Sequence, residues 1–262
     1  SKEIVAMLPT ILEAKSVLYP EIAYPTYLVG ALIAKAKSET VNFDAGSWPK
    51  ADLAWINTPS NPTGRVNSDS EIISAINWAR KNGVAIFDEC YLEFGDSKKP
   101  KSVLSFTNGD NRNILAVHSL SKRSNMAGYR AAMLIGDPEL IARILEVRKH
   151  AGGMVPLPVQ KAMVAALSDT DHVSAQRSRY NARREKVRKA IVDAGFEIEF
   201  SEAGLYLWAT RDESDWESVA WFADRGILVT PGHFYGSAGA KHIRIALTAS
   251  DEQIDELVKR LS

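Results

Sequence analysis

The sequence predicts an α/β protein: a three-layer α/β/α domain built on a mostly parallel sheet, followed by a smaller α+β C-terminal domain. Short β-rich segments alternate with amphipathic helical segments, which is the pattern of parallel strands connected by helices. Several β-rich segments are almost wholly apolar, as expected of strands that are covered on both faces. The strands predicted for the first domain are residues 16–18, 53–57, 84–87, 114–118 and 131–135.

Residues that commonly cap helices mark the ends of the segments between these strands. Ser68 and Glu71 form the pattern of a capping box before a helical segment at 72–81, and Gly83 is expected to end that helix. Asp137 is placed to cap the next long helix, because its side chain can accept the free backbone N–H groups of the first turn.

The second domain is marked by a long, highly charged helical pattern at 171–194 that ends at Gly195. The charges around Arg183 and Arg184 are interpreted as a solvated helix face. Ser250, with Gln253, is expected to cap the last helix. We predict a boundary near residue 170, which gives a large domain at 1–170 and a small domain at 171–262. The strands predicted for the small domain are 196–200, 205–209 and 243–247.

Composition limits the classes of partner. The 32 Lys and Arg residues balance 32 Asp and Glu residues, so no basic excess supports nucleic-acid binding. No apolar run approaches the roughly 18 residues that span a bilayer, so no membrane partner is expected. Cys90 is the single cysteine, which excludes an intrachain disulfide and a cysteine-rich metal site. A reducing, cytoplasmic location fits this composition, and no metal is expected.

The start of the chain is unusual. It begins Ser1-Lys2-Glu3, without a methionine or a signal peptide, and it enters a helical pattern at once. We expect that the chain lacks an N-terminal segment.

Four short motifs follow predicted strands, at the sheet edge where open α/β sheets bind ligands. They are Asn61-Pro-Thr-Gly, Asp88-Glu-Cys-Tyr91, Ser119-Leu-Ser-Lys122 and Arg130. Each motif alone has an ordinary structural explanation. The first suits a turn, Asp88 suits a helix cap, and a lysine such as Lys122 is usually solvated. A desolvated lysine is also the usual amine nucleophile for carbonyl cofactors.

Together these motifs resemble those of the class I and II aminotransferases, in the same order and at the same spacing. The resemblance covers essentially the whole chain, from Ser1-Lys2-Glu3 to the strand that contains Arg244. It implies the type I fold of pyridoxal-phosphate enzymes and pyridoxal 5′-phosphate as the cofactor. Kinase and dinucleotide-binding functions lack their glycine-rich motifs in this sequence.

The resemblance implies a role for each matching residue around the cofactor ring. Lys122 would hold the cofactor as a Schiff base and then move the proton between substrate and cofactor. Asp88 would pair with the pyridine nitrogen and keep it protonated. Asn61 and Tyr91 would hydrogen-bond the phenolic oxygen of the cofactor. Tyr27 matches the aromatic residue that stacks on the ring, although an aromatic residue at a helix start is the simpler alternative.

The phosphate and the substrate have their own expected partners. Ser119 and Arg130 would bind the phosphate, together with the helix start at Ser1 and Lys2, where backbone N–H groups favour an anion. Arg244 would bind the substrate carboxylate, because its apolar neighbours in the strand imply that it faces the other side of the sheet. The alternative for Arg244 is an outward-facing strand arginine.

Within the family, two blocks resemble the actinobacterial N-succinyldiaminopimelate aminotransferases of lysine biosynthesis. These are Ser119 to Arg130 and the Pro231-Gly-His-Phe-Tyr-Gly loop, which is also expected near the substrate entrance. The resemblance implies a homodimer that exchanges an amino group between N-succinyl-L,L-diaminopimelate and 2-oxoglutarate. Alternatives are an aspartate or aromatic aminotransferase, a carbon–sulfur lyase, and a regulatory domain that binds the cofactor without catalysis.

Overall fold

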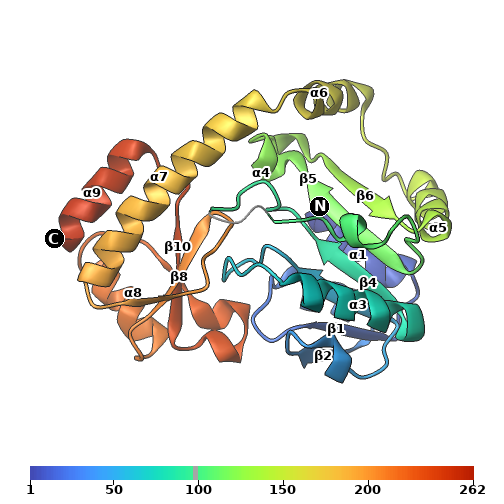
Figure 1. Ribbon diagram of the computed structural model, residues 1–262, viewed down its shortest axis with the longest axis horizontal. Coiled ribbons are helices and arrows are strands. Elements are labelled where there is room, and N and C mark those ends of the chain that lie inside the picture. The colour runs from blue at the N-terminus through green and yellow to red at the C-terminus, as the bar shows by residue number, and fades with distance from the viewer. Residues whose placement is uncertain (97–99) are drawn as a thin grey trace.

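The computed structural model describes residues 1–96 and 100–262 and shows two sheets (Figure 1). The larger sheet has the strand order β2-β1-β3-β4-β5-β6, and all neighbouring strands are parallel except β5 and β6. Its strands are β1 (Ser16–Pro20), β2 (Lys37–Val41), β3 (Leu53–Asn57), β4 (Val84–Asp88), β5 (Ile114–Ser119) and β6 (Ala132–Gly136).

Helices cover both faces of this sheet and bury its apolar side chains. On one face, α3 (Asp69–Asn82) packs its apolar stripe against the sheet. On the other face, α1 (Lys2–Ile11), α2 (Thr26–Ile33) and α5 (Pro138–His150) form a second core around Trp55. Successive residues of a strand point to opposite faces, so a strand such as β3, buried throughout, requires both layers. The predicted three-layer α/β/α arrangement is therefore confirmed.

The smaller sheet is antiparallel and has the order β7-β8-β10-β9. Its core contains Val187, Leu207 and Ile243, from a helix and two strands that are distant in sequence. The predicted α+β character of this part is confirmed. Its strands are β7 (Glu197–Glu199), β8 (Tyr206–Thr210), β9 (Thr230–Pro231) and β10 (His242–Ala246). The remaining helices are α4 (Leu120–Arg123), α6 (Leu157–Ser168), α7 (Asp171–Asp193), α8 (Asp215–Ala223) and α9 (Asp251–Leu261). Short 3₁₀ turns are η1 (Ala45–Ser47), η2 (Val103–Phe106), η3 (Ala127–Tyr129), η4 (Gly232–Tyr235) and η5 (Ser237–Gly239).

The predicted helix caps form as expected, but Gly83 ends its helix for a different reason. Ser68 and Glu71 make both hydrogen bonds of a capping box, and Asp137 accepts two backbone N–H groups of α5. Gly83 does end α3, but its φ of 177° is extended backbone rather than the left-handed conformation of a typical glycine cap. Glycine is needed there because a Cβ would lie 2.1 Å from the carbonyl oxygen of Ala51.

The interpretation of the charged helix was wrong for Arg184. This residue of α7 is fully buried, and its guanidinium donates to the backbone carbonyls of Ser201, Gly204 and Tyr206. Burial lowers the pKa of Arg184 to about 10. The side chain thus ties α7 to the start of β8 instead of facing water. None of the described helices is long and apolar enough to cross a membrane.

Glu89 is a buried carboxyl group just beyond β4. It is 2% exposed, and it accepts the backbone N–H of Val103 at 2.7 Å. Burial raises the pKa of Glu89 from its usual 4.5 to about 7. A raised carboxyl pKa means that the folded state binds the proton more tightly, so its stabilising contribution is complete below about pH 4.5 and is lost as the pH rises through about 7.

The prediction from Glu89 concerns stability against pH. Replacing Glu89 with Gln keeps an acceptor for Val103 and removes the titration. From about pH 5 to about pH 8, the free energy of unfolding of Glu89→Gln should rise relative to wild type by about 2–3 kcal/mol. Urea titrations of both proteins at each pH measure this difference. A difference that stays constant across the range would show that Glu89 does not titrate there.

Candidate active site

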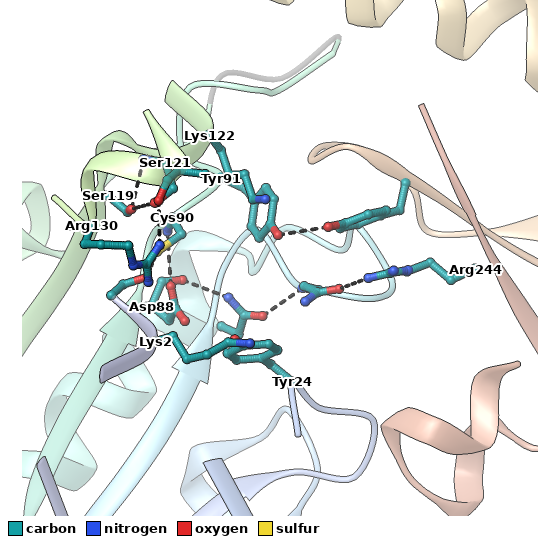
Figure 2. Close-up of a pocket in the computed structure, with 15 residues that line it drawn as sticks. Lys2, Tyr24, Asp88, Cys90, Tyr91, Ser119, Ser121, Lys122, Arg130 and Arg244 are labelled. Carbon is teal, nitrogen blue, oxygen red and sulfur yellow. Dashed lines mark hydrogen bonds between the residues drawn. The ribbon is translucent and has the colours of Figure 1, made fainter. Parts of the chain in front are cut away.

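Three neighbouring strands of the large sheet end in polar residues at one edge. These are Asn57 of β3, Asp88 of β4 and Ser119 of β5, and the register pairs Asn57 with Asp88. A cavity of about 290 Å³ lies at this edge, and its lining includes Tyr206 of β8 and Arg244 of β10, from the small sheet. Figure 2 shows Arg244 across the cavity from Asp88. The lining residues are Ser1, Lys2, Tyr24, Asn57, Asn61, Asp88, Cys90, Tyr91, Ser119, Ser121, Lys122, Ala127, Arg130, Tyr206 and Arg244.

All of the predicted site residues except Tyr27 line this cavity. The structure therefore brings together side chains that are far apart in sequence, although their chemical roles remain predictions. The residues in question are Ser1, Lys2, Asn61, Asp88, Tyr91, Ser119, Lys122, Arg130 and Arg244.

The expectation that Tyr27 stacks on a cofactor ring was wrong. Tyr27 is fully buried, and its ring stacks on Trp55 at 4.9 Å between centroids. It lies in the first turn of α2, which packs against the sheet, so its ring faces the core. Tyr24, three residues earlier, precedes the helix and lines the cavity instead.

Tyr27 nevertheless acts on the site through Asp88. Its hydroxyl donates to Oδ2 of Asp88 at 2.9 Å, and the backbone N–H of Cys90 donates to Oδ1 at 3.2 Å. Burial, and then the charge of Asp88, raise the pKa of Tyr27 well above its ordinary value, so the phenol stays a donor. Asp88 is 5% exposed, and these two donors hold its carboxylate as an acceptor facing the cavity.

Hydroxyl groups and cations gather at one end of the cavity. Ser119 and Ser121 place their hydroxyl oxygens 3.0 Å apart at the start of α4, and Arg130 lies beside them (Figure 2). Arg130 is held in a left-handed conformation, with φ of 57°, and its guanidinium donates to the carbonyl of Ala127 at 2.6 Å. Hydroxyl and guanidinium donors together suit a dianionic phosphate group.

Lys122 lies on the short helix α4, directly after this serine pair. Figure 2 shows its side chain extending into the cavity beside Tyr91. The hydroxyl of Tyr91 lies 3.2 Å from that of Tyr206, which comes from the small sheet. Burial, and then the nearby Tyr206, raise the pKa of Tyr91 well above its ordinary value, so the phenol remains protonated.

Arg244 closes the opposite end of the cavity. Its neighbours Ile243 and Ile245 are buried, so the arginine faces the other side of the strand, as predicted. Its guanidinium donates to Oδ1 of Asn61 at 3.0 Å and lies 4.0 Å from the ring centre of Tyr206. Its buried Nε has no hydrogen-bond partner among the residues that the structure describes. A buried donor without a partner is expected to bind an acceptor from a ligand.

These donor sets fit pyridoxal phosphate. Ser119, Ser121 and Arg130 supply donors for a phosphate at one end, and Asp88 supplies an anionic acceptor for a protonated ring nitrogen. Lys122 supplies the amine, and the unpartnered Nε of Arg244 supplies a donor for a substrate carboxylate. The described residues contain no group of His, Cys, Asp and Glu that could hold a metal ion.

The motifs did not identify several lining residues: Tyr24, Asn57, Cys90, Ser121, Ala127 and Tyr206. Asn57 has a clear structural function, because its side-chain carbonyl accepts the backbone N–H of Asn61 at 2.7 Å and its amide donates to the carbonyl of Asp88. The position of Asn57 at the end of a buried strand was the available signal. No sequence signal marked Tyr206, since its partner Tyr91 is distant in sequence.

Comparison with known proteins agrees with this geometry. A family model described as aminotransferase class I and II matches residues 1–261. The chain belongs to this family. It is 51% identical to the probable aminotransferase Rv1178 of Mycobacterium tuberculosis, over all of this chain and 64% of that protein. It is 50% identical to 4-dedimethylamino-4-oxo-anhydrotetracycline transaminase OxyQ of Streptomyces rimosus, over all of this chain and 75% of that protein.

A solved structure shows the same fold. The probable N-succinyldiaminopimelate aminotransferase of Thermus thermophilus matches with a TM-score of 0.90 and 27% identity. The match covers all of this chain and 75% of that one. The chain thus spans between about two thirds and three quarters of the length of these relatives.

Proposed function

We propose that this aminotransferase-family chain uses pyridoxal phosphate, held by Lys122, to move an amino group between an amino acid and a 2-oxo acid. The observation that carries the proposal is the single cavity that joins an amine, a buried carboxylate, a phosphate-type donor set and an arginine with a free donor. When bound, pyridoxal phosphate supplies an aldehyde that condenses with amines and a ring that withdraws electrons from the substrate Cα.

The residues of the chain supply the binding and the proton transfers. Lys122 would hold the cofactor through its amine, and the freed amine would carry the proton from the substrate Cα to C4′ of the cofactor. Asp88 would keep the ring nitrogen protonated, because two donors hold its carboxylate in place and a carboxylate favours a cation beside it. Asn61 and Tyr91 would hydrogen-bond the phenolic oxygen of the cofactor, and Arg244 would bind the substrate carboxylate through its N–H groups.

The donor that we propose is N-succinyl-L,L-diaminopimelate, with 2-oxoglutarate as the acceptor. Support comes from the Thermus structure at 27% identity and from a relative of Dehalococcoides mccartyi named LL-diaminopimelate aminotransferase, at 32% identity. The Streptomyces relative carries the name of a tetracycline transaminase at higher identity. Amino acceptors of that polycyclic class therefore belong in any substrate panel.

A half-reaction panel tests this proposal. Purified protein with bound pyridoxal phosphate is mixed with one amino donor at a time, and the visible absorbance of the cofactor is followed as it converts to the near-ultraviolet band of the amine form. We expect rapid conversion with N-succinyl-L,L-diaminopimelate and slow conversion with aspartate or phenylalanine. Conversion by none of the donors would contradict transaminase activity. Preference for another donor would contradict only the proposed substrate and not the transaminase activity.

Tyr24 and Tyr27 should respond differently to substitution. Tyr24→Ala removes the aromatic ring that faces the cavity, so it should raise the Kd for pyridoxal phosphate about three- to tenfold. Tyr27→Phe keeps the stacking on Trp55 and removes the hydrogen bond to Asp88. It should lower the free energy of unfolding by about 1.5–3 kcal/mol, with a smaller effect on Kd. Cofactor titration and urea denaturation of both variants measure the two effects, and an unchanged Kd in Tyr24→Ala would contradict a stacking role for Tyr24.

Two further expectations about the whole protein stay proposals. We propose a homodimer, which the mass from light scattering tests. We also propose a cytoplasmic location, which fits the single free Cys90. The predicted domain boundary near residue 170 lies just before α7, and limited proteolysis tests it.

A further inference from the structure

A chain of hydrogen bonds reaches the helix of Lys122 from the start of α7. Nδ1 of His172 lies 2.7 Å from Oδ2 of Asp169, and Nε2 of His172 lies 2.9 Å from the hydroxyl of Ser124. Ser124 caps the C-terminal end of α4, two residues after Lys122. We call Asp169, His172 and Ser124 the α7–α4 relay.

The relay has the connectivity of a hydrolase triad, but its surroundings do not suit a nucleophile. A nucleophilic serine needs free backbone N–H groups for the oxyanion. The N–H groups of Ser124 and Met126 both donate to the carbonyl of Leu120, and that of Asn125 donates to the carbonyl of Lys122. The hydroxyl of Ser124 also accepts from the guanidinium of Arg123 at 3.2 Å. The relay therefore fixes a position instead of activating a hydroxyl group.

Arg123 makes a second connection in the same direction. It is 5% exposed, and its guanidinium donates to the carbonyl of Ala166, in the last turn of α6, at 2.7 Å. It also lies 3.7 Å from the carboxylate of Glu93. α4 contains only four residues, too few to hold its own position, so these outside contacts decide where it lies.

The other end of α7 holds the small sheet. Arg184 donates to the carbonyl of Tyr206 in β8, and Arg183 pairs with Asp251 of α9 at 2.6 Å. Figure 1 shows α7 running from α6, above α4, to the small sheet. Tyr206 in turn meets Tyr91 in the cavity. One helix thus contacts the end of the Lys122 segment and the strand that closes the cavity.

We propose that the α7–α4 relay positions Lys122 relative to the small sheet, so that His172 and Ser124 are positioning residues for the amine. The carboxylate of Asp169 orients the imidazole of His172 and also accepts the backbone N–H of Asp171 at 2.8 Å. That second bond fixes the first turn of α7. The imidazole then bridges α7 to the Ser124 hydroxyl, and the amine of Lys122 stays directed into the cavity.

Amide hydrogen exchange, followed by mass spectrometry, tests the relay without use of the cofactor. His172→Ala and Ser124→Ala should each speed exchange in residues 120–126 about tenfold, and the double variant should add little to Ser124→Ala, since both single changes remove the His172–Ser124 hydrogen bond. Ser124→Thr keeps the hydroxyl and should restore slow exchange. His150→Ala is the matched control, because His150 pairs with Glu146 at 3.0 Å on α5. Exchange in 120–126 that stays unchanged in His172→Ala, or rises equally in His150→Ala, would overturn the proposal.

A second measurement concerns the amine itself and rests on the proposed function. At saturating pyridoxal phosphate, borohydride trapping at Lys122 should be about tenfold slower in His172→Ala, with an unchanged Kd for the cofactor. A weaker Kd with an unchanged trapping rate would show a purely structural effect and would contradict positioning. If wild-type protein is not trapped at all, the proposed function fails, while the exchange measurement still decides the relay.

Discussion

Lys122→Ala is expected to abolish covalent attachment of pyridoxal phosphate while the fold is retained. The side chain extends into the cavity and is not part of the hydrophobic core, so its removal should cost little stability. The amine is the nucleophile that bonds the aldehyde, and no hydroxyl group nearby can replace it. Borohydride treatment followed by peptide mass mapping should find the cofactor on the peptide of 120–130 in wild type and nowhere in the variant.

Lys2 provides the control for this prediction. It is the second lysine of the cavity, and its ammonium group lies 5.9 Å from the ring centre of Tyr24. Lys2→Ala should weaken cofactor binding by removing a positive charge, yet borohydride should still fix the cofactor at Lys122. Fixation at Lys2 in the Lys122→Ala protein, at the wild-type rate, would show that the motif assignment is wrong.

The strands of the large sheet could be predicted because their apolar composition indicates that they are buried. β3 and β4 are apolar nearly throughout, and turn residues bound them. β2 was missed for the opposite reason. Its sequence, Lys37-Ser-Glu-Thr-Val41, is polar because it forms the exposed edge of the sheet, and only pairing with β1 makes it a strand. β9 has two residues and carries no periodic pattern at all.

The convergence of the motifs could also be predicted, because parallel strands bring their carboxyl ends to one edge. What spacing could not provide was the direction of single side chains. Tyr24 and Tyr27 are three residues apart, and the start of α2 between them decides which ring enters the core. Arg184 lies in a highly charged helix, and its burial depends on carbonyl groups from a loop that only the fold brings near.

Contacts between the large-sheet part and the small-sheet part could not be predicted from the sequence, for a related reason. The Tyr91–Tyr206 and Asn61–Arg244 pairs join residues that are more than a hundred positions apart. No local pattern specifies such a pair. Such a pair forms only when α7 positions the small sheet against the large one. That position is determined by many packing contacts together.

Asp88→Asn is expected to keep the cofactor bound and to lose transamination by about 10²- to 10⁴-fold. The change preserves size, so the residue can still occupy its 5% exposed position between Tyr27 and Cys90. A neutral amide cannot stabilise a protonated ring nitrogen, and an unprotonated ring withdraws electrons poorly from the substrate Cα. The single-turnover rate with the preferred donor measures the loss, and cofactor titration shows that binding survives.

Glu89→Gln is the matched control, because it makes the same carboxyl-to-amide change at the next residue, which is equally buried. Glu89 faces Val103 and the core rather than the cavity, so this variant should turn over near the wild-type rate. The contrast between two adjacent substitutions separates the charge of one carboxylate from a general effect of altering this strand end. Equal losses in both variants would identify Asp88 as a structural cap. A near-normal rate in Asp88→Asn would exclude it as the partner of the ring nitrogen.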